Sequence, residues 1–165
     1  KDRHPARENG TIAEYVAEKF PDLHLWPRDV RARARARSIC AEMHSGFGAL
    51  RSACGMNIEA HLPETGALIW RDNAGVRADV QRLVAMWSAL LQQHGGPMLF
   101  GAFSIADAFY APVCMRLTTF ALPVPQPIAD YVRRVQALPG VKDWIDGALA
   151  EADFREFEEP YRLRR

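Results

Sequence analysis

Residues 101–110, GAFSIADAFY, combine the start signal of a helix with a helix that is almost wholly apolar. Ser104 and Asp107 have the spacing of a capping box, in which the serine hydroxyl accepts from the N–H of Asp107 and the Asp107 carboxylate accepts from the N–H of Ser104. Few polar side chains follow before Leu117, so the helix is expected at the centre of a bundle. An unpaired donor there would cost about 1–3 kcal/mol. The pair is therefore predicted to be structural, and not an acid or base.

Outward from this segment, apolar residues recur every three or four positions and never alternate over a strand length. Turn residues separate these segments, and Pro112 is expected to bend the capped helix. The pattern predicts further helices at 11–19, 29–54, 76–91, 128–135 and 141–149. We therefore expect an all-α fold, a bundle of about five to seven helices.

The composition limits the classes of function. The chain has 165 residues, 48% of them hydrophobic and 25% charged, which is ordinary for a globular domain. A net charge of +1 argues against a general nucleic-acid binder. Apolar stretches end well before the roughly 20 residues that a bilayer requires, and residues 1–10 carry no apolar signal-peptide core. We expect a cytoplasmic protein that engages neither membrane nor nucleic acid.

Residues 30–37, VRARARAR, place four arginines at alternate positions. At 100° per residue, Arg31 and Arg35 fall on one side of a helix, and Arg33 and Arg37 on nearly the opposite side. One stripe is expected to face solvent, and the other solvent or a partner that carries a carboxylate. Phosphate binding is the alternative.

Cysteine and histidine spacing predicts neither redox nor metal chemistry. Cys40, Cys54 and Cys114 form no C-x-x-C pair and are expected to be buried thiols of a reducing compartment. The five histidines show no spacing typical of metal ligands, so no metal site is predicted.

Residues 101–110, together with VPQPIADYVRRVQALPGVKDWI at 124–145, resemble the helical C-terminal domain of bacterial-type glutathione S-transferases. In that family an S/T-x-x-D box opens the central helix and a Leu-Pro-x-Val-x-x-Trp turn opens a later one. The stretch ENGTIAEYVAEKFPD at 8–22 is similar to the last helix of the family's thioredoxin-like N-terminal domain. The resemblance divides the chain into a remnant of that domain, 1–22, and a helical domain, 23–165.

The resemblance implies glutathione as co-substrate and a small apolar electrophile as second substrate. In the family, the thioredoxin-like domain binds glutathione and supplies the residue that stabilises its thiolate. That residue and the strands around it have no counterpart here, so no catalytic residue is assigned and the chain is expected to be inactive alone. Glu8 and Asn9 align with the dipeptide that contacts the γ-glutamyl end of glutathione.

The same resemblance places the electrophile pocket against the predicted helix 29–54. Met43, Phe47 and Arg51 share one stripe at i, i+4 and i+8. Met43 and Phe47 would receive the electrophile, Arg51 would hold an anionic group, and His44 lies beside them. Core packing of Met43 and Phe47, and an ordinary partly buried His44, are the alternatives. Gly46 and Gly48 would serve either close packing or room for a ligand.

Family members usually form dimers through this helix and its neighbour, so a homodimer is expected. The alternative function is a non-catalytic interaction or dimerisation module, because domains similar to this helical half also occur in assemblies of the translation machinery.

Overall fold

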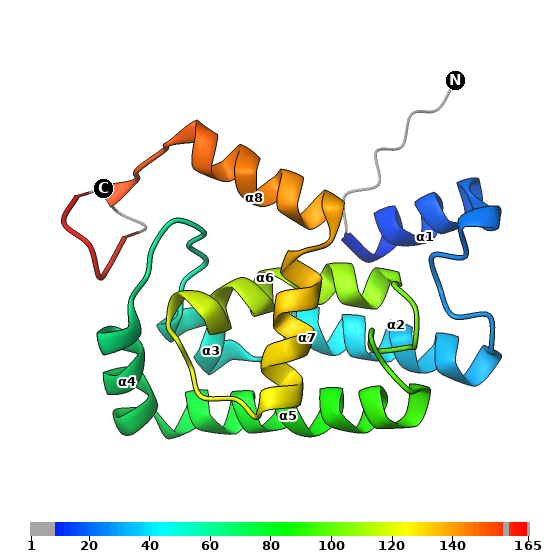
Figure 1. The fold of residues 1–165 in the computed structure, drawn as a ribbon, viewed down its shortest axis with the longest axis horizontal. Helices are drawn as coiled ribbons and strands as arrows, with labels where there is room; N and C mark the ends of the chain where they lie inside the picture. The colour runs from blue at the N-terminus through cyan, green and yellow to red at the C-terminus, as the bar shows by residue number, and fades with distance from the viewer. Residues whose placement is uncertain (1–8, 157–158, 165) are drawn as a thin grey trace.

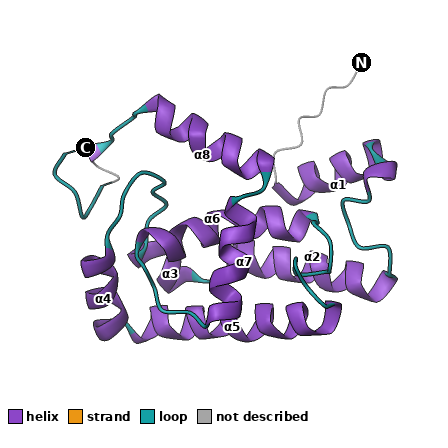
Figure 2. Cartoon of the chain, viewed as in Figure 1, coloured by secondary structure: helices purple, strands orange, loops and turns teal. Residues whose placement is uncertain are grey.

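The computed structural model describes residues 9–156 and 159–164. In this part of the chain every regular element is a helix and no strand forms (Figures 1 and 2). The elements are α1 (Asn9–Lys19), the 3₁₀-helix η1 (Pro21–Leu23), α2 (Val30–Ser45), α3 (Gly48–Ala53), α4 (Pro63–Asp72), α5 (Ala74–His94), α6 (Ile105–Thr119), α7 (Gln126–Gln136) and α8 (Pro139–Glu151). The predicted all-α class is confirmed.

Helix α6 is the central element of the bundle. It packs against α2 and α7, and ten of its fifteen residues are buried. An aromatic cluster joins it to its neighbours, because Trp87 of α5 meets Tyr110 of α6 and Tyr131 of α7 edge to face, with ring centroids 5.3 and 5.0 Å apart. All three rings are fully buried. Residues 105–117 are therefore apolar because α6 is buried at the centre of the bundle, as the sequence indicated.

The capping box at the start of α6 is confirmed. Both halves are present, and the Asp107 carboxylate accepts the Ser104 N–H at 2.8 Å. The same carboxylate also accepts the Ser104 hydroxyl at 3.1 Å, the Leu99 N–H at 3.1 Å and the Tyr131 hydroxyl at 3.0 Å. One side chain thus joins the α5–α6 loop, the start of α6 and the middle of α7.

Asp107 is fully buried. Burial raises the pKa of its carboxyl group, and the hydrogen bonds from Leu99, Ser104 and Tyr131 oppose that rise. Because each of these donors is also buried, the carboxylate satisfies groups that would otherwise lack an acceptor.

The prediction of a single helix at 29–54 is wrong, because α2 ends at Ser45. Phe47 lies in the left-handed region at φ 56°, and α3 begins anew at Gly48. A Cβ on Gly46 would lie 2.6 Å from the carbonyl oxygen of Glu42. Glycine therefore allows the backbone to turn out of α2 close to this carbonyl. The packing explanation for Gly46 is supported, although neither glycine lies in a helix interior as expected.

Helix α4 was not predicted, since no helix was expected between residues 54 and 76. Only Gly66 is buried in this helix, and a Cβ there would lie 1.7 Å from the carbonyl oxygen of Phe120. Gly66 is therefore required for the close approach of α4 to the end of α6, and the same glycine weakens the helix pattern. The described residues form eight α-helices and not the expected five to seven, because the 29–54 segment is divided in two and α4 is added.

The expectation that the cysteines are buried is met. Cys40, Cys54 and Cys114 are buried, unpaired thiols. The C-terminal segment packs back through Tyr161, whose hydroxyl donates to the Ala53 carbonyl at 2.8 Å and whose ring meets Phe120. None of the helices in the described residues is long and apolar enough to cross a membrane.

Replacing Asp107 by alanine is expected to lower the free energy of unfolding by about 3–5 kcal/mol, because four buried donors lose their acceptor together. Urea denaturation followed by circular dichroism measures the change. Asp146→Ala is the matched control, since this exposed carboxylate of α8 makes a surface ion pair with Lys142 and its loss should cost about 0.5 kcal/mol or less. Equal losses in the two variants would contradict the central role of Asp107.

Candidate functional site

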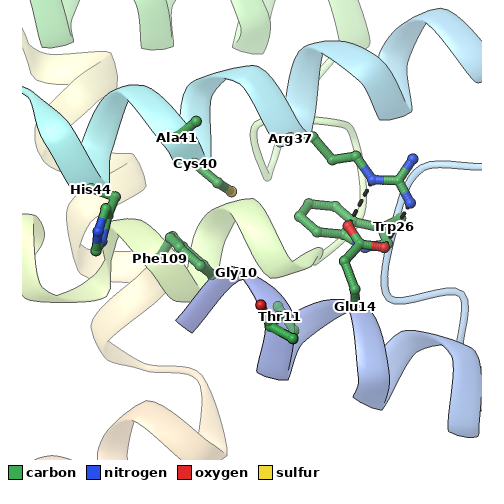
Figure 3. A pocket seen from close by; sticks show the side chains of 10 residues that line it. Gly10, Thr11, Glu14, Trp26, Arg37, Cys40, Ala41, His44 and Phe109 are labelled. Atoms are coloured by element: carbon green, nitrogen blue, oxygen red, sulfur yellow. Dashed lines mark hydrogen bonds and ion pairs between the residues drawn. The ribbon is translucent and has the colours of Figure 1, made fainter. Parts of the chain in front are cut away.

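A cavity of about 520 Å³ lies between α1, α2 and α6 (Figure 3). Helix α2 supplies one wall, α6 contributes Phe109, and the linker before α2 contributes Trp26. The cavity is lined by Gly10, Thr11, Ala13, Glu14, Trp26, Arg37, Cys40, Ala41, His44 and Phe109. Its volume lies within the range typical of small-molecule sites.

An ion pair forms the polar end of the cavity. Arg37 donates from Nε and Nη2 to the two carboxylate oxygens of Glu14, each at 2.7 Å, and its guanidinium lies 5.6 Å from the Trp26 ring centre (Figure 3). The hydrogen bond from Arg37 lowers the pKa of Glu14, and the same bond raises the pKa of Arg37. The predicted carboxylate partner of one arginine stripe is thus confirmed for Arg37.

This ion pair connects α1 to the rest of the molecule. None of the described side chains of α1 is buried, and its apolar residues Ile12 and Tyr15 are 43% and 57% exposed. Figure 1 shows α1 at the edge of the bundle. One face of α1 therefore closes the cavity while much of its apolar surface remains uncovered.

The other walls are mainly apolar and contain one thiol and one imidazole. Cys40 is 5% exposed, and burial, together with the charges of Asp107 and Glu14, raises the pKa of its thiol to about 12. A thiol with such a pKa is almost wholly protonated at neutral pH and is a poor nucleophile. Cys40 therefore supplies a wall of the cavity rather than a reactive group.

Comparison with known proteins assigns the fold. Residues 30–147 match the model of the glutathione S-transferase C-terminal domain. The chain belongs to the glutathione S-transferase family. A solved structure of a glutathione transferase homologue from Burkholderia gl BGR1, with bound glutathione, is similar at a TM-score of 0.65 and 26% identity. The similarity covers 91% of this chain and 71% of that chain. Comparison with curated proteins gives no match.

Of the four pocket residues suggested by the glutathione transferase resemblance, His44 lines the cavity. Phe47 is buried in the core, and Met43 packs against the core. Arg51 is exposed and donates from Nη1 to the His44 carbonyl at 2.7 Å, which fastens α3 to the end of α2. The stripe at i, i+4 and i+8 does not exist, because the helix on which it depended is broken at Gly46.

Of the two predicted glutathione contacts, the structure describes only Asn9. Glu8 is outside the described residues, and Asn9 is the first residue of the helix. The lining of the cavity begins at the next residue, Gly10.

Sequence reasoning missed the most polar part of this cavity. Arg37 was noticed, but Glu14 lies 23 positions away and only the fold joins the two. Trp26 lies in an irregular linker and carries no periodic signal. Among the described residues, no group of three or more His, Cys, Asp or Glu side chains is arranged to hold a metal ion.

Glu14→Gln is expected to loosen α1 without affecting the core. Because the pKa of Glu14 is lowered from 4.5, the ion pair stabilises the docked helix above about pH 4.5, and this stabilisation is lost as the pH falls through the lowered value. Amide hydrogen exchange should therefore be faster in α1 of Glu14→Gln than in wild type at about pH 6, and the difference should shrink as the pH falls below 4.5. Glu18→Gln is the control, because this exposed carboxylate lies one turn further along α1 and acts on Arg37 through its charge alone, without the paired hydrogen bonds of Glu14. If both variants exchange alike, the ion pair does not hold the helix.

Native Cys40 should react with iodoacetamide at least about thirtyfold more slowly than in the urea-unfolded chain, because burial raises its pKa from 9.0 to about 12 and lowers the thiolate fraction. Mass spectrometry after timed quenching gives both rates. Comparable rates would show that the cavity wall at Cys40 is open and its thiol ordinary.

Proposed function

We propose that this chain is the helical half of a glutathione-conjugating enzyme and that the cavity between α1, α2 and α6 is the electrophile side of its active site. The observation that carries the proposal is the combination of family membership with a cavity of ligand size at His44. The fold supplies apolar walls from Phe109 and Ala41 beside a charged end at Arg37. An aromatic electrophile would bury its ring against the walls.

The exposed side of α1 supports the division of the chain at residues 22 and 23. Ile12, Tyr15 and Phe20 are between 43% and 57% exposed, which is a large apolar area for a helix end of a bundle. In this proposal α1 is the last helix of a thioredoxin-like half, and the remainder of that half would cover these side chains.

Glutathione would bind at the start of α1. The first turn of this helix carries no acidic residue, and its Gly10 and Thr11 line the cavity. Free N–H groups and the helix dipole favour an anionic group at such an end. Glu8 and Asn9 are proposed to contact the γ-glutamyl end of glutathione, close to an electrophile bound in the cavity.

The chemical roles follow from the character of the walls. The described residues exclude water from the electrophile and orient its ring, which favours attack by a thiolate that is already formed. Activation of the glutathione thiol is assigned to the thioredoxin-like half. Met43 and Phe47 are proposed to support the cavity wall from the core, and Arg51 to hold the carbonyl of His44 in place.

A homodimer across α2 and α5 is proposed for the assembled enzyme. Arg82 of α5 pairs with Glu42 of α2 at 2.7 and 2.9 Å, which joins the two helices near the surface where Arg31 and Arg35 are exposed.

The three buried free thiols suit a reducing compartment, which supports the cytoplasm as the location of this protein. Nothing in the comparisons favours the alternative of an interaction module.

The conjugate S-(2,4-dinitrophenyl)glutathione tests the proposal without requiring catalysis. Calorimetric titration of this chain is expected to give saturable binding, and Ala41→Trp, which fills the cavity, should weaken it by at least about tenfold. Ala78→Trp, at an exposed position of α5, is the matched control and should bind as wild type. Absence of binding, or equal loss in the two variants, would overturn the assignment of the cavity.

A further inference from the structure

Helix α3 is only six residues long, and side chains of other helices hold both of its ends. At its start, Asp79 of α5 accepts the Leu50 N–H at 2.9 Å. At its end, Arg116 of α6 donates from Nη1 to the carbonyl of Cys54, the residue that follows the helix. A helix of this length is unstable by itself, so contacts of this kind set its position.

A further contact to α3 comes from residues 159–162, which we call the C-terminal clamp. The Tyr161 hydroxyl donates at 2.8 Å to the carbonyl of Ala53, the last residue of α3. The Tyr161 ring packs edge to face on Phe120 of the core, with ring centroids 5.8 Å apart. The clamp therefore holds the end of α3, whereas the start of α3 follows directly from α2.

The C-terminal clamp is itself fastened to the loop that follows α3. Arg162 donates to both carboxylate oxygens of Glu159, at 2.8 and 2.6 Å, and to the carboxylate of Glu59 at 3.2 Å. Glu159 also accepts from Nδ2 of Asn57 at 2.7 Å. The side chains of Arg162 and Glu159 are 17% and 12% exposed, so this network is better shielded from water than an ordinary surface ion pair. Tyr161 is thus held against α3 by its neighbours on both sides.

At its other end, α3 reaches the electrophile cavity. Arg51 donates from Nη1 to the His44 carbonyl at 2.7 Å, and the His44 side chain lies on the cavity wall (Figure 3). Gly46 and Phe47 alone separate α2 from α3. Because the helix is short and its connection to α2 is tight, a shift at Ala53 also moves Arg51 and, with it, His44.

We propose that Tyr161 is a positioning residue for the electrophile cavity, and that it fixes the place of His44 through α3 and Arg51. No residue of the C-terminal clamp lines the cavity, so the clamp acts without touching a bound ligand. Without the Tyr161 hydrogen bond, the end of α3 is free to move and Arg51 no longer holds the His44 carbonyl in one place. The effect on a bound electrophile rests on the proposed function, whereas the route from Tyr161 to His44 rests on the hydrogen bonds alone.

Tyr161→Phe tests the first half of this route, because it keeps the ring on Phe120 and removes only the hydroxyl. Amide hydrogen exchange of the whole chain, followed by NMR, is expected to be about five- to tenfold faster at Arg51 and Cys54. Tyr15→Phe is the matched control, because it removes the hydroxyl of a 57% exposed tyrosine on α1 and should leave α3 as in wild type. Equal exchange at α3 in the two variants would overturn the proposal.

The imidazole resonances of His44 test the second half of the route. Tyr161→Phe and Arg51→Ala are each expected to shift them. In the Arg51→Ala background, Tyr161→Phe is expected to add no further shift, because both changes act on the same route. Additive shifts would refute the role of α3 and Arg51 as that route. Faster exchange in α3 with unchanged His44 resonances would make the C-terminal clamp a structural contact only and would also refute the proposal.

Binding of S-(2,4-dinitrophenyl)glutathione separates this inference from the proposed function. Tyr161→Phe is expected to weaken the conjugate by about threefold relative to wild type and to Tyr15→Phe. Equal affinity in all three proteins would refute the effect of Tyr161 on the cavity. If wild type itself fails to bind the conjugate, the proposed function fails, and the exchange of α3 and the His44 resonances still decide for or against the positioning role.

Discussion

The buried carboxylate of Asp107 is the constraint on which the structure depends. Its two oxygens accept hydrogen bonds from the α5–α6 loop, the start of α6 and the Tyr131 hydroxyl of α7. A carboxylate without water is costly to bury, so these donors and the carboxylate need one another. The position of α6 follows from this network, and with it the position of Phe109 in the cavity between α1, α2 and α6.

The cavity between α1, α2 and α6 rests on the same framework. It closes against α1 through the Glu14–Arg37 ion pair, so its arginine is already matched by a carboxylate. Trp26, in the linker before α2, forms the wall beside this pair.

Local sequence signals predicted the parts of the fold that local physics determines. The Ser104–Asp107 box, the apolar α6 and the amphipathic α5 and α7 all follow from spacing and capping. The break at Gly46 and the helix around Gly66 did not follow from apolar spacing. At Gly46 the chain turns close to the Glu42 carbonyl of the same helix, and Gly66 lies against the distant Phe120 carbonyl. The site shows the same limit: His44 was placed by resemblance, whereas the Glu14–Arg37 pair and Trp26 come together only through tertiary packing.

The central claim is that Asp107 fixes the junction of three elements as one cooperative unit. Native-state amide hydrogen exchange at Leu99 and Ser104, followed by NMR against low concentrations of urea, tests it most directly. If the network holds the junction, both amides exchange only through global unfolding, with the same free energy and urea dependence as the core of α5. Exchange of either amide through a local opening, independent of urea, would contradict the account.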